Sequence, residues 1–396
     1  MYLCHSTMAL QYRLTTTTID DLTLDLTHAP VAGPEQSEVR ATYLPAEWAR
    51  QSGVQLTWPH EGTDWAPVLG EVTDCYVRMA LEIALRERLI VVTPEAEAVE
   101  RLLRERLPQR ALKNVEFCQM PTNDTWARDH GFITLKTSTG RLLLDFQFNG
   151  WGRKFAADED NRICRRMMGL MAPRAGQAPV LNGQYEDHLD FVLEGGSIES
   201  DGHGTLLTTS QCLMAPNRNQ PLTQTEIEQR LKRYLHVERV LWLDHGYLAG
   251  DDTDSHIDTL ARFCPNDTIA YVQCTDPADE HYAELRLMEE QLRGFRTTDN
   301  RPYRLIALPM AKARYEGMAD EADEAARGQR LPATYANFLC VNGAVLMPTY
   351  RDPERDERAR RQLQLAFPRH EIVGVDCRVL IEQHGSLHCC TMQFPA

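Results

Sequence analysis

Two adjacent cysteines near the end of this sequence could supply a nucleophile. Residues 384–391 contain His384 and His388, followed by Cys389 and Cys390. A cysteine with histidines nearby can ionise and attack an electrophilic carbon. The alternative is a pair of buried cysteines in a terminal strand, where neighbouring side chains point to opposite faces. Taken alone, this motif favours the buried pair.

A second stretch, residues 250–258, is dense in carboxylates and contains His256 and Asp258. If residues 256–262 form a strand, these two side chains share one face. Neighbouring carboxylates stabilise the cationic form of a histidine, which suits an acid and base. A metal site and a solvated loop remain as alternatives, since Asp and His are also metal ligands.

Two more stretches place carboxylates beside predicted strands. Residues 123–131 contain Trp126 and Asp129, and an ordinary charged turn with an Asp–Arg ion pair is the alternative to a site there. Glu194 follows an apolar run and precedes two glycines. A carboxylate in apolar surroundings needs a partner, so Glu194 is expected either to orient a histidine or to cap the glycine turn.

Sheet and helix segments alternate around these motifs. Two hairpin turns, at residues 138–140 and 201–204, exclude a purely parallel sheet. Close sequence repeats are absent from this α/β pattern, although the order of strands and helices recurs about every 60–80 residues. Apolar spacing, proline positions and a capping box at Thr223 and Glu226 predict helices over residues 76–89, 95–112, 223–236, 278–295 and 353–367. Strands are predicted over residues 89–92, 131–136, 142–148, 204–208, 237–243, 268–272, 303–308, 338–346 and 371–375.

Composition restricts the function classes. Hydrophobic residues make up 43% of the chain, enough for a sizeable core, and the formal net charge of −15 makes nucleic acid or an anionic membrane a poor partner. No apolar run is long enough to span a membrane, and no export signal is visible. The eleven cysteines include no Cys-x-x-Cys pair, which favours reduced thiols and a cytoplasmic location. Residues 1–40 are interpreted as an N-terminal extension and residues 41–396 as one domain.

Together, the motifs resemble the agmatine deiminase family, with the bacterial peptidylarginine deiminases as a sister group. The resemblance runs from about residue 43 to the end of the chain. The matching segments are residues 44–48, 58–60, 123–131, 145–152, 194–197, 216–219, 250–258, 335–338, 341–345, 348–350 and 388–389.

The resemblance implies a pentein fold, a five-bladed α/β propeller of ββαβ-type units around a pseudo-five-fold axis. It implies Cys389 as nucleophile and His256 as general acid and base. Asp129 and Asp258 would bind the guanidinium, and Glu194 would orient His256. Trp126 is expected to contact the substrate, and Asn337 to contact the substrate or the reacting cysteine. The sequence departs from the family at Phe132, at Cys390 and in the stretch 384–387, which puts the shape of the pocket in doubt.

The implied reaction is hydrolysis of the guanidinium of agmatine to N-carbamoylputrescine and ammonia, through a covalent thiouronium on the cysteine. No cofactor or metal is expected, and the expected partner is a small cationic guanidine, with self-association into a homo-oligomer left open. The alternatives are a peptidylarginine or free-arginine deiminase, a metal-dependent hydrolase built on His256 and Asp258, and a binding protein without activity.

Overall fold

The strands of the chain form five separate sheets with mixed α/β connections. The computed structural model describes residues 41–170, 180–317 and 328–396, so the expected N-terminal extension lies outside the described residues. Residues Arg40–Ala396 form one compact unit. The sheets are, in strand order, β1 (Thr42–Tyr43), β5 (Ile133–Thr137), β6 (Arg141–Gln147) and β7 (Gln184–Val192); β10 (Arg239–Leu243), β9 (Thr205–Thr209) and β8 (Ile198–Ser200); β11 (Ala261–Cys264), β12 (Thr268–Gln273) and β13 (Arg304–Pro309); β14 (Leu339–Val341), β15 (Ala344–Thr349) and β16 (Glu371–Asp376); and β17 (Thr391–Pro395), β2 (Gln51–Thr57), β3 (Arg88–Thr93) and β4 (Val115–Gln119).

Each sheet contains the same three-stranded unit. An antiparallel pair is followed by a crossover to a third, parallel strand, as in β8–β9–β10 and β11–β12–β13. The units β5–β6–β7 and β14–β15–β16 repeat this order. In the last unit, β17 from the C-terminal end pairs with β2, which then crosses over to β3. The recurrence predicted from the sequence therefore corresponds to a repeated supersecondary unit.

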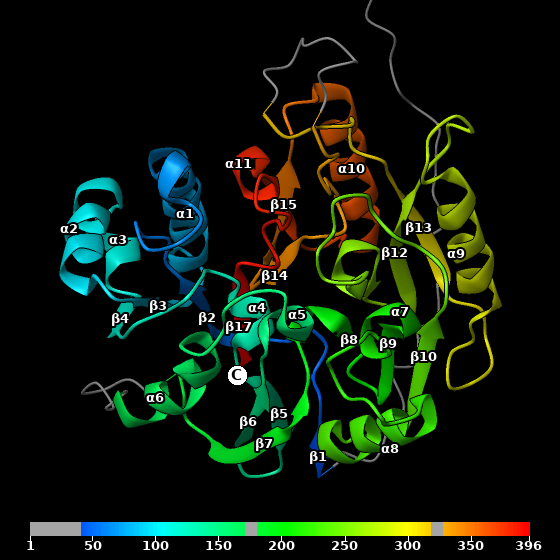
Figure 1. Ribbon diagram of the computed structural model, residues 1–396, viewed down its shortest axis with the longest axis horizontal. Helices are drawn as coiled ribbons and strands as arrows, with labels where there is room; N and C mark the ends of the chain where they lie inside the picture. Colours follow the sequence, from blue (N-terminus) through cyan, green and yellow to red (C-terminus); the bar gives the residue numbers. More distant parts are fainter. Residues whose placement is uncertain (1–40, 171–179, 318–327) are drawn as a thin grey trace, which may run out of the picture. The chain divides into compact units, whose positions relative to one another are not determined.

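Helices connect the parallel strands and cover their sheets, as parallel pairing requires. In Figure 1, the long helices α1, α8, α9 and α10 lie at the periphery of the described unit, and the strands lie between them. The α-helices are α1 (Leu69–Ala84), α2 (Ala96–Arg106), α3 (Gln109–Leu112), α4 (Ala127–His130), α5 (Gly150–Arg153), α6 (Ile163–Leu170), α7 (Ser210–Leu213), α8 (Gln224–Leu235), α9 (Tyr282–Gly294), α10 (Pro353–Ala366) and α11 (Arg378–Ile381), and the 3₁₀ helices are η1 (Ala66–Val68), η2 (Asp160–Arg162), η3 (Gly195–Ser197) and η4 (Ile257–Thr259).

Several sequence predictions are confirmed. Helix α8 begins at the predicted capping box, with Thr223 and Glu226 bonded reciprocally, and α10 begins at Pro353. Both predicted hairpins join antiparallel strands, β5 to β6 and β8 to β9.

Other predictions are wrong, and local chemistry explains most of them. The helix predicted over residues 95–112 is two helices, because Pro108 lacks an amide donor and separates α2 from α3. The strand predicted over residues 338–346 is the hairpin β14–β15, which turns at Asn342 and Gly343, where Gly343 has φ 78°. The first helix begins at Leu69 and ends at Ala84, earlier than predicted at both ends.

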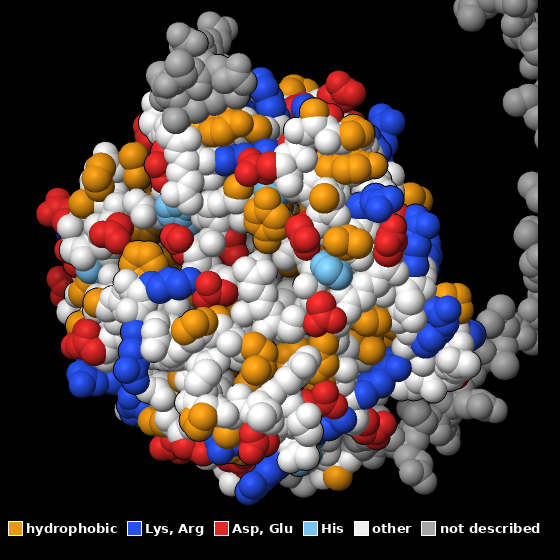
Figure 2. Space-filling model, turned by 45° about the vertical axis from the view of Figure 1, so that its right-hand side comes forward, with side chains coloured by type: hydrophobic (Ala, Val, Ile, Leu, Met, Phe, Trp, Pro, Cys, Tyr) orange, Lys and Arg blue, Asp and Glu red, His pale blue; other side chains and the backbone are white. Residues whose placement is uncertain are grey.

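Figure 2 shows acidic, basic and hydrophobic side chains interspersed over the face that it draws. Such a mixed surface lacks the extended basic patch that a nucleic-acid-binding face needs. Among the described residues, no helix is long and apolar enough to cross a membrane.

Candidate active site

The thiol of Cys389 lies in a turn directly before β17 and not within a strand, contrary to the terminal-strand prediction. Asn337 holds this turn: its Oδ1 accepts hydrogen bonds from the backbone amides of His388 (2.9 Å) and Cys389 (3.3 Å). The Asn337 Nδ2 lies 3.3 Å from Cys389 Sγ, where it can donate to a thiolate. Asn337 therefore contacts the candidate nucleophile and positions it.

His256 lies immediately before η4, and the strand predicted over residues 256–262 begins only at Ala261, in β11. Residues 254 and 255 have φ of 64° and 65°, a tight turn that a strand cannot contain. The imidazole is fully buried, with Nδ1 3.7 Å from Asp129 Oδ1 and Nε2 3.5 Å from Glu194 Oε2. Neither imidazole nitrogen has a hydrogen-bond partner among the described residues, which leaves both available for proton transfer.

Asp129, in the short helix α4, is buried and held in a fixed orientation. Its Oδ1 accepts from the backbone amide of Gly196 (3.0 Å) and its Oδ2 from the indole of Trp151 (3.0 Å). The neighbouring Arg128 points elsewhere, toward the carbonyl of His388 and the sulfur of Met392. The local Asp–Arg pair considered from the sequence is therefore not formed.

Asp258, in η4, lies beside the candidate nucleophile. Its Oδ2 is 3.8 Å from Cys389 Sγ and 2.7 Å from His388 Nδ1, while Oδ1 has no hydrogen-bond partner among the described residues. His256 and Asp258 thus reach the same site from a turn and a 3₁₀ helix instead of from one strand face.

Gly196 marks the point where these groups converge. A Cβ atom at this position would lie 2.6 Å from His256 Nδ1, 2.9 Å from Asp129 Oδ1 and 3.1 Å from Asp258 Oδ2. Any side chain here would displace one of the three groups. The second glycine of the 194–197 motif therefore makes room for the acid–base and carboxylate groups to approach one another.

The electrostatics of the site favour a neutral thiol and a cationic imidazole. Burial raises the pKa of Cys389 well above its ordinary value, and the charges of Asp258 and Asp129 raise it further. Burial acts to lower the pKa of His256, but Asp129, Cys212 and Glu194 together outweigh it, so this pKa lies well above its ordinary value. Burial raises the pKa of Asp129 to about 6 even though the His256 charge opposes the shift.

A cavity of about 160 Å³ leads to Cys389 and contains acidic and aromatic side chains. Trp126, Trp151 and Phe155 supply apolar walls, and no lysine or arginine is among the lining residues. Its remaining lining residues are Asp64, Asp124, Asp129, Asp252, Thr253, Gln383, His384, Gly385 and Cys389. A cavity with this lining suits an elongated cation.

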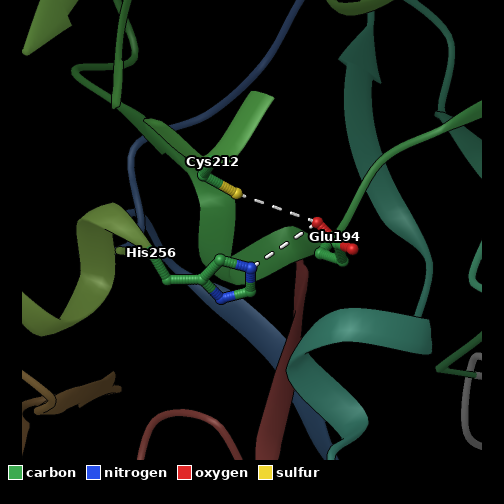
Figure 3. Close-up of side chains that lie close together, drawn as sticks. All are labelled: Glu194, Cys212 and His256. Carbon is green, nitrogen blue, oxygen red and sulfur yellow. Dashed lines mark hydrogen bonds and ion pairs between the residues drawn. The ribbon is translucent and has the colours of Figure 1, made fainter. Parts of the chain in front are cut away.

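Glu194, Cys212 and His256 form a compact buried group (Figure 3), whose potential ligand atoms lie within 4.8 Å of one another. The Glu194 carboxylate already accepts Arg218 Nε at 3.0 Å from both of its oxygens. Burial acts to raise the pKa of Glu194, but the neighbouring His256 and Arg218 cations lower it below its ordinary value. This carboxylate is therefore occupied by a permanent cation and placed to orient His256, which disfavours a metal ion in the same position.

The structure brings together all seven residues singled out from the sequence: Cys389, His256, Asp129, Asp258 and Glu194 around one point, Asn337 against the thiol and Trp126 in the cavity wall. Sequence reasoning missed the contributions of Trp151, Arg218, Cys212 and His388. Trp151 and Arg218 lie in segments that carry the family resemblance, at 145–152 and 216–219. The sequence therefore contained a signal for both residues, but no role was assigned to either.

Comparisons with known proteins identify the family of this chain. The family model of Porphyromonas-type peptidyl-arginine deiminase matches residues 43–395. A Vibrio parahaemolyticus protein named "Putative agmatine deiminase" is 34% identical over 362 residues, 89% of this chain and 97% of its own length.

Two solved structures are also similar. The "Putative Arginine Deiminase" of Porphyromonas gingivalis is 51% identical, covers 89% of this chain and 98% of its own, and has a TM-score of 0.80. A Cys-to-Ser variant of Campylobacter jejuni agmatine deiminase with substrate bound is 36% identical, covers 90% of this chain and 96% of its own, and has a TM-score of 0.78. With matches over nearly the whole described sequence, this chain belongs to the Porphyromonas-type peptidyl-arginine deiminase family.

Proposed function

We propose that this protein is an agmatine deiminase, a hydrolase that converts the guanidinium of agmatine to a ureido group and releases ammonia. The convergence of Asp129, Asp258, His256 and Cys389 supports the chemistry, and the relatives named as agmatine deiminases support the substrate. The catalytic domain spans residues 41–396, with its five repeated sheet units arranged as a pentein propeller. The ten described cysteines are unpaired and buried, which supports a reducing compartment such as the cytoplasm.

In the first half of the reaction, the guanidinium binds between the carboxylates of Asp129 and Asp258. Burial and the two negative charges hold the proton on Cys389; the positive charge of the guanidinium offsets those charges, so binding favours release of the thiol proton to solvent and formation of the thiolate. The thiolate attacks the central carbon, and the electron pair of one C=N bond moves to nitrogen to give a neutral tetrahedral adduct. His256, as imidazolium, donates its proton to the departing nitrogen, ammonia leaves, and a thiouronium remains on the cysteine.

In the second half, the neutral His256 takes a proton from water. The hydroxide adds to the same carbon, the C–S bond breaks with its electrons returning to sulfur, and the ureido product leaves after loss of one proton. Glu194, held by Arg218, keeps His256 oriented through both proton transfers.

The lining of the cavity favours agmatine over free arginine. The tail of agmatine ends in an ammonium, whereas free arginine also carries a carboxylate, and Asp64, Asp124 and Asp252 line the cavity. Like charges brought together in a binding site cost several kcal/mol. The methylene chain would lie against Trp126, Trp151 and Phe155, and the ammonium near Asp252.

Ammonia release from agmatine, free arginine and an arginyl peptide tests this proposal. We expect kcat/KM for agmatine to exceed that for arginine by roughly 100-fold, the equivalent of about 2.8 kcal/mol. Asp252→Asn should raise the KM for agmatine and narrow this preference, whereas Asp190→Asn, at an exposed position that does not line the cavity, should change neither. A higher kcat/KM on the peptide would replace agmatine with peptidylarginine as the substrate.

Activity in the presence of a chelator tests the metal-dependent alternative, which the Glu194–Cys212–His256 group raises. The proposed mechanism predicts full activity on agmatine after prolonged treatment with a chelator. Loss of activity that added zinc restores would favour the metal-dependent hydrolase.

The pH dependence should follow the ionisation of Asp129. This side chain binds a cation only as a carboxylate, and its pKa of about 6 means that protonation removes the charge below that pH. We expect kcat/KM for agmatine to fall about tenfold per unit as pH decreases below this pKa. Circular dichroism at each pH serves as the control for folding, and a flat profile between pH 5 and 8 would show that Asp129 does not govern binding.

A further inference from the structure

The geometry points to His388 as a positioning residue that fixes the Asp258 carboxylate beside the nucleophile through a hydrogen bond from its imidazole Nδ1. This inference rests on the proposed deiminase reaction and assigns a role to the residue that precedes the catalytic cysteine. His388 is only 1% exposed and does not line the cavity that leads to Cys389, so it acts through Asp258 and not on the substrate.

His388 contacts both the Asp258 carboxylate and the Asn337 oxygen that holds the turn of the nucleophile. Nδ1 lies 2.7 Å from Asp258 Oδ2, the oxygen that is 3.8 Å from Cys389 Sγ. The backbone amide of His388 donates to Asn337 Oδ1 at 2.9 Å, and the same oxygen accepts from the amide of Cys389. The imidazole of His388 therefore holds the Asp258 carboxylate, and its backbone amide binds the same Asn337 oxygen that holds the amide of Cys389.

The opposite side of the imidazole is anchored in a buried charge network. His388 Nε2 lies 2.7 Å from Glu47 Oε2 and 3.1 Å from Arg262 Nη2. Arg262 is fully buried and also donates to Glu199 Oε2 (2.7 Å) and to the backbone carbonyl of Phe338 (2.6 Å). Because these partners come from distant parts of the chain, the ring has little freedom to rotate away from Asp258.

The proton on Nδ1 is specified by its surroundings. Burial acts to raise the pKa of Asp258, but the hydrogen bond from His388 and nearby positive charges lower it, so Asp258 is an ionised acceptor. If Nε2 accepts from Arg262, the neutral ring carries its proton on Nδ1; if Nε2 donates to Glu47, the ring carries both protons. In either state, Nδ1 donates to Asp258.

Two substitutions distinguish the role of His388 Nδ1 from the role of Nε2. Asparagine places an N–H donor near the position of Nδ1, and glutamine places one near Nε2. We expect His388→Asn to keep most of the activity and His388→Gln to lower kcat/KM on agmatine by about 10- to 100-fold, the range for a lost hydrogen bond to a charged group. The reverse order would show that the contact with Glu47 matters and would overturn the inference.

Substrate affinity gives a readout that is independent of turnover. In a Cys389→Ala background, calorimetry with agmatine measures binding with and without His388→Gln, and with and without Asp258→Asn. If His388 acts through Asp258, His388→Gln should weaken binding in the background alone and have little further effect once Asp258 is asparagine. Equal losses in both backgrounds would mean that His388 acts elsewhere.

The pH profile distinguishes positioning from a general loss of structure. Removing the Nδ1 donor should raise the pKa of Asp258, so the ratio of wild-type to His388→Gln kcat/KM should grow as pH falls. A ratio that stays constant with pH would contradict the inference. The titratable and charged groups that face Asp258 are His388, His256, Arg262, Arg128, Asp129 and Cys389.

His281 provides a matched control. It is also buried, and its Nδ1 lies 2.7 Å from Asp279 Oδ1, but Asp279 is paired with Arg330, whereas the partner of His388, Asp258, lies 3.8 Å from Cys389 Sγ. His281→Gln should lower thermal stability without the pH-dependent change in kcat/KM. If the wild-type protein has no activity on agmatine, the proposed function itself is wrong. If the wild type is active and the His388→Gln variant is unaffected, only the role of His388 is refuted.

Discussion

Replacing Cys389 with alanine should abolish turnover of agmatine, whereas replacing Cys390 should leave most of it. Cys389 lies at the inner end of the cavity, with Asn337 Nδ2 at 3.3 Å and Asp258 Oδ2 at 3.8 Å from its sulfur. Cys390 is fully buried and does not line the cavity. Removal of a nucleophile that acts together with an acid–base partner costs on the order of 10⁴-fold or more in kcat. Steady-state ammonia release by both variants measures the difference.

The covalent intermediate provides an independent measurement on the wild-type protein. Only ammonia leaves in the first half-reaction, so a rapid acid quench during turnover should trap the whole substrate minus one nitrogen on the cysteine. Intact-mass and peptide analysis should locate this adduct on Cys389. An adduct on Cys390, or activity in Cys389→Ala but not in Cys390→Ala, would move the nucleophile by one position and overturn the arrangement described above.

The sequence predicted which residues form the site better than it predicted the elements that carry them. His256 and Asp258 reach the site from a turn and a 3₁₀ helix, although their spacing predicted one strand face. Cys389 lines the cavity and Cys390 does not, which is the difference that the sequence predicted. The cause is a turn, whereas the predicted cause was the alternation of side chains along a strand. Alternation of side-chain types over a few residues predicts a strand but cannot exclude a turn. Backbone at positive φ, as at residues 254 and 255, leaves no clear pattern in side-chain type.

Residues that act through contacts over long sequence distances were the least visible. His388 lies 2.7 Å from Glu47, which is 341 positions earlier in the chain, and Trp151 donates to Asp129 across 22 positions. Arg218 holds Glu194 from a loop 24 positions away. Nothing in local propensity encodes these pairs, since they depend on how the sheet units assemble. The structure was needed to distinguish a side chain that supports the site from one that merely lies in a matching segment.

Removing the charge of either carboxylate proposed to bind the guanidinium should nearly eliminate activity without unfolding the protein. Asp129 and Asp258 are both buried, and loss of one partner of a buried charge pair costs roughly 3–5 kcal/mol. We therefore expect Asp129→Asn and Asp258→Asn each to lower kcat/KM on agmatine by about 10²- to 10³-fold or more. The asparagine side chains keep the size of the carboxyl groups, so the expected loss is mainly one of charge.

The two variants should differ in their effect on His256. Asp129 is the largest of the influences that raise the pKa of His256, and burial alone would lower that pKa. In Asp129→Asn, the imidazole should therefore lose its proton at a lower pH, so this variant loses both a binding charge and part of the acid that protonates the leaving nitrogen. Measured as a function of pH, its residual kcat should decline at lower pH than that of Asp258→Asn as the solution becomes alkaline.

Asp145 offers a matched control for both variants. It is 2% exposed, burial raises its pKa to about 6 as in Asp129, and it accepts a hydrogen bond from Tyr185 at 2.9 Å without lining the active-site cavity. Asp145→Asn should therefore retain activity, with circular dichroism and thermal unfolding reported for all three proteins. Near-normal kcat/KM in Asp129→Asn or Asp258→Asn would show that the substituted carboxylate does not bind the guanidinium, because a desolvated cation cannot lose a paired charge without a large cost.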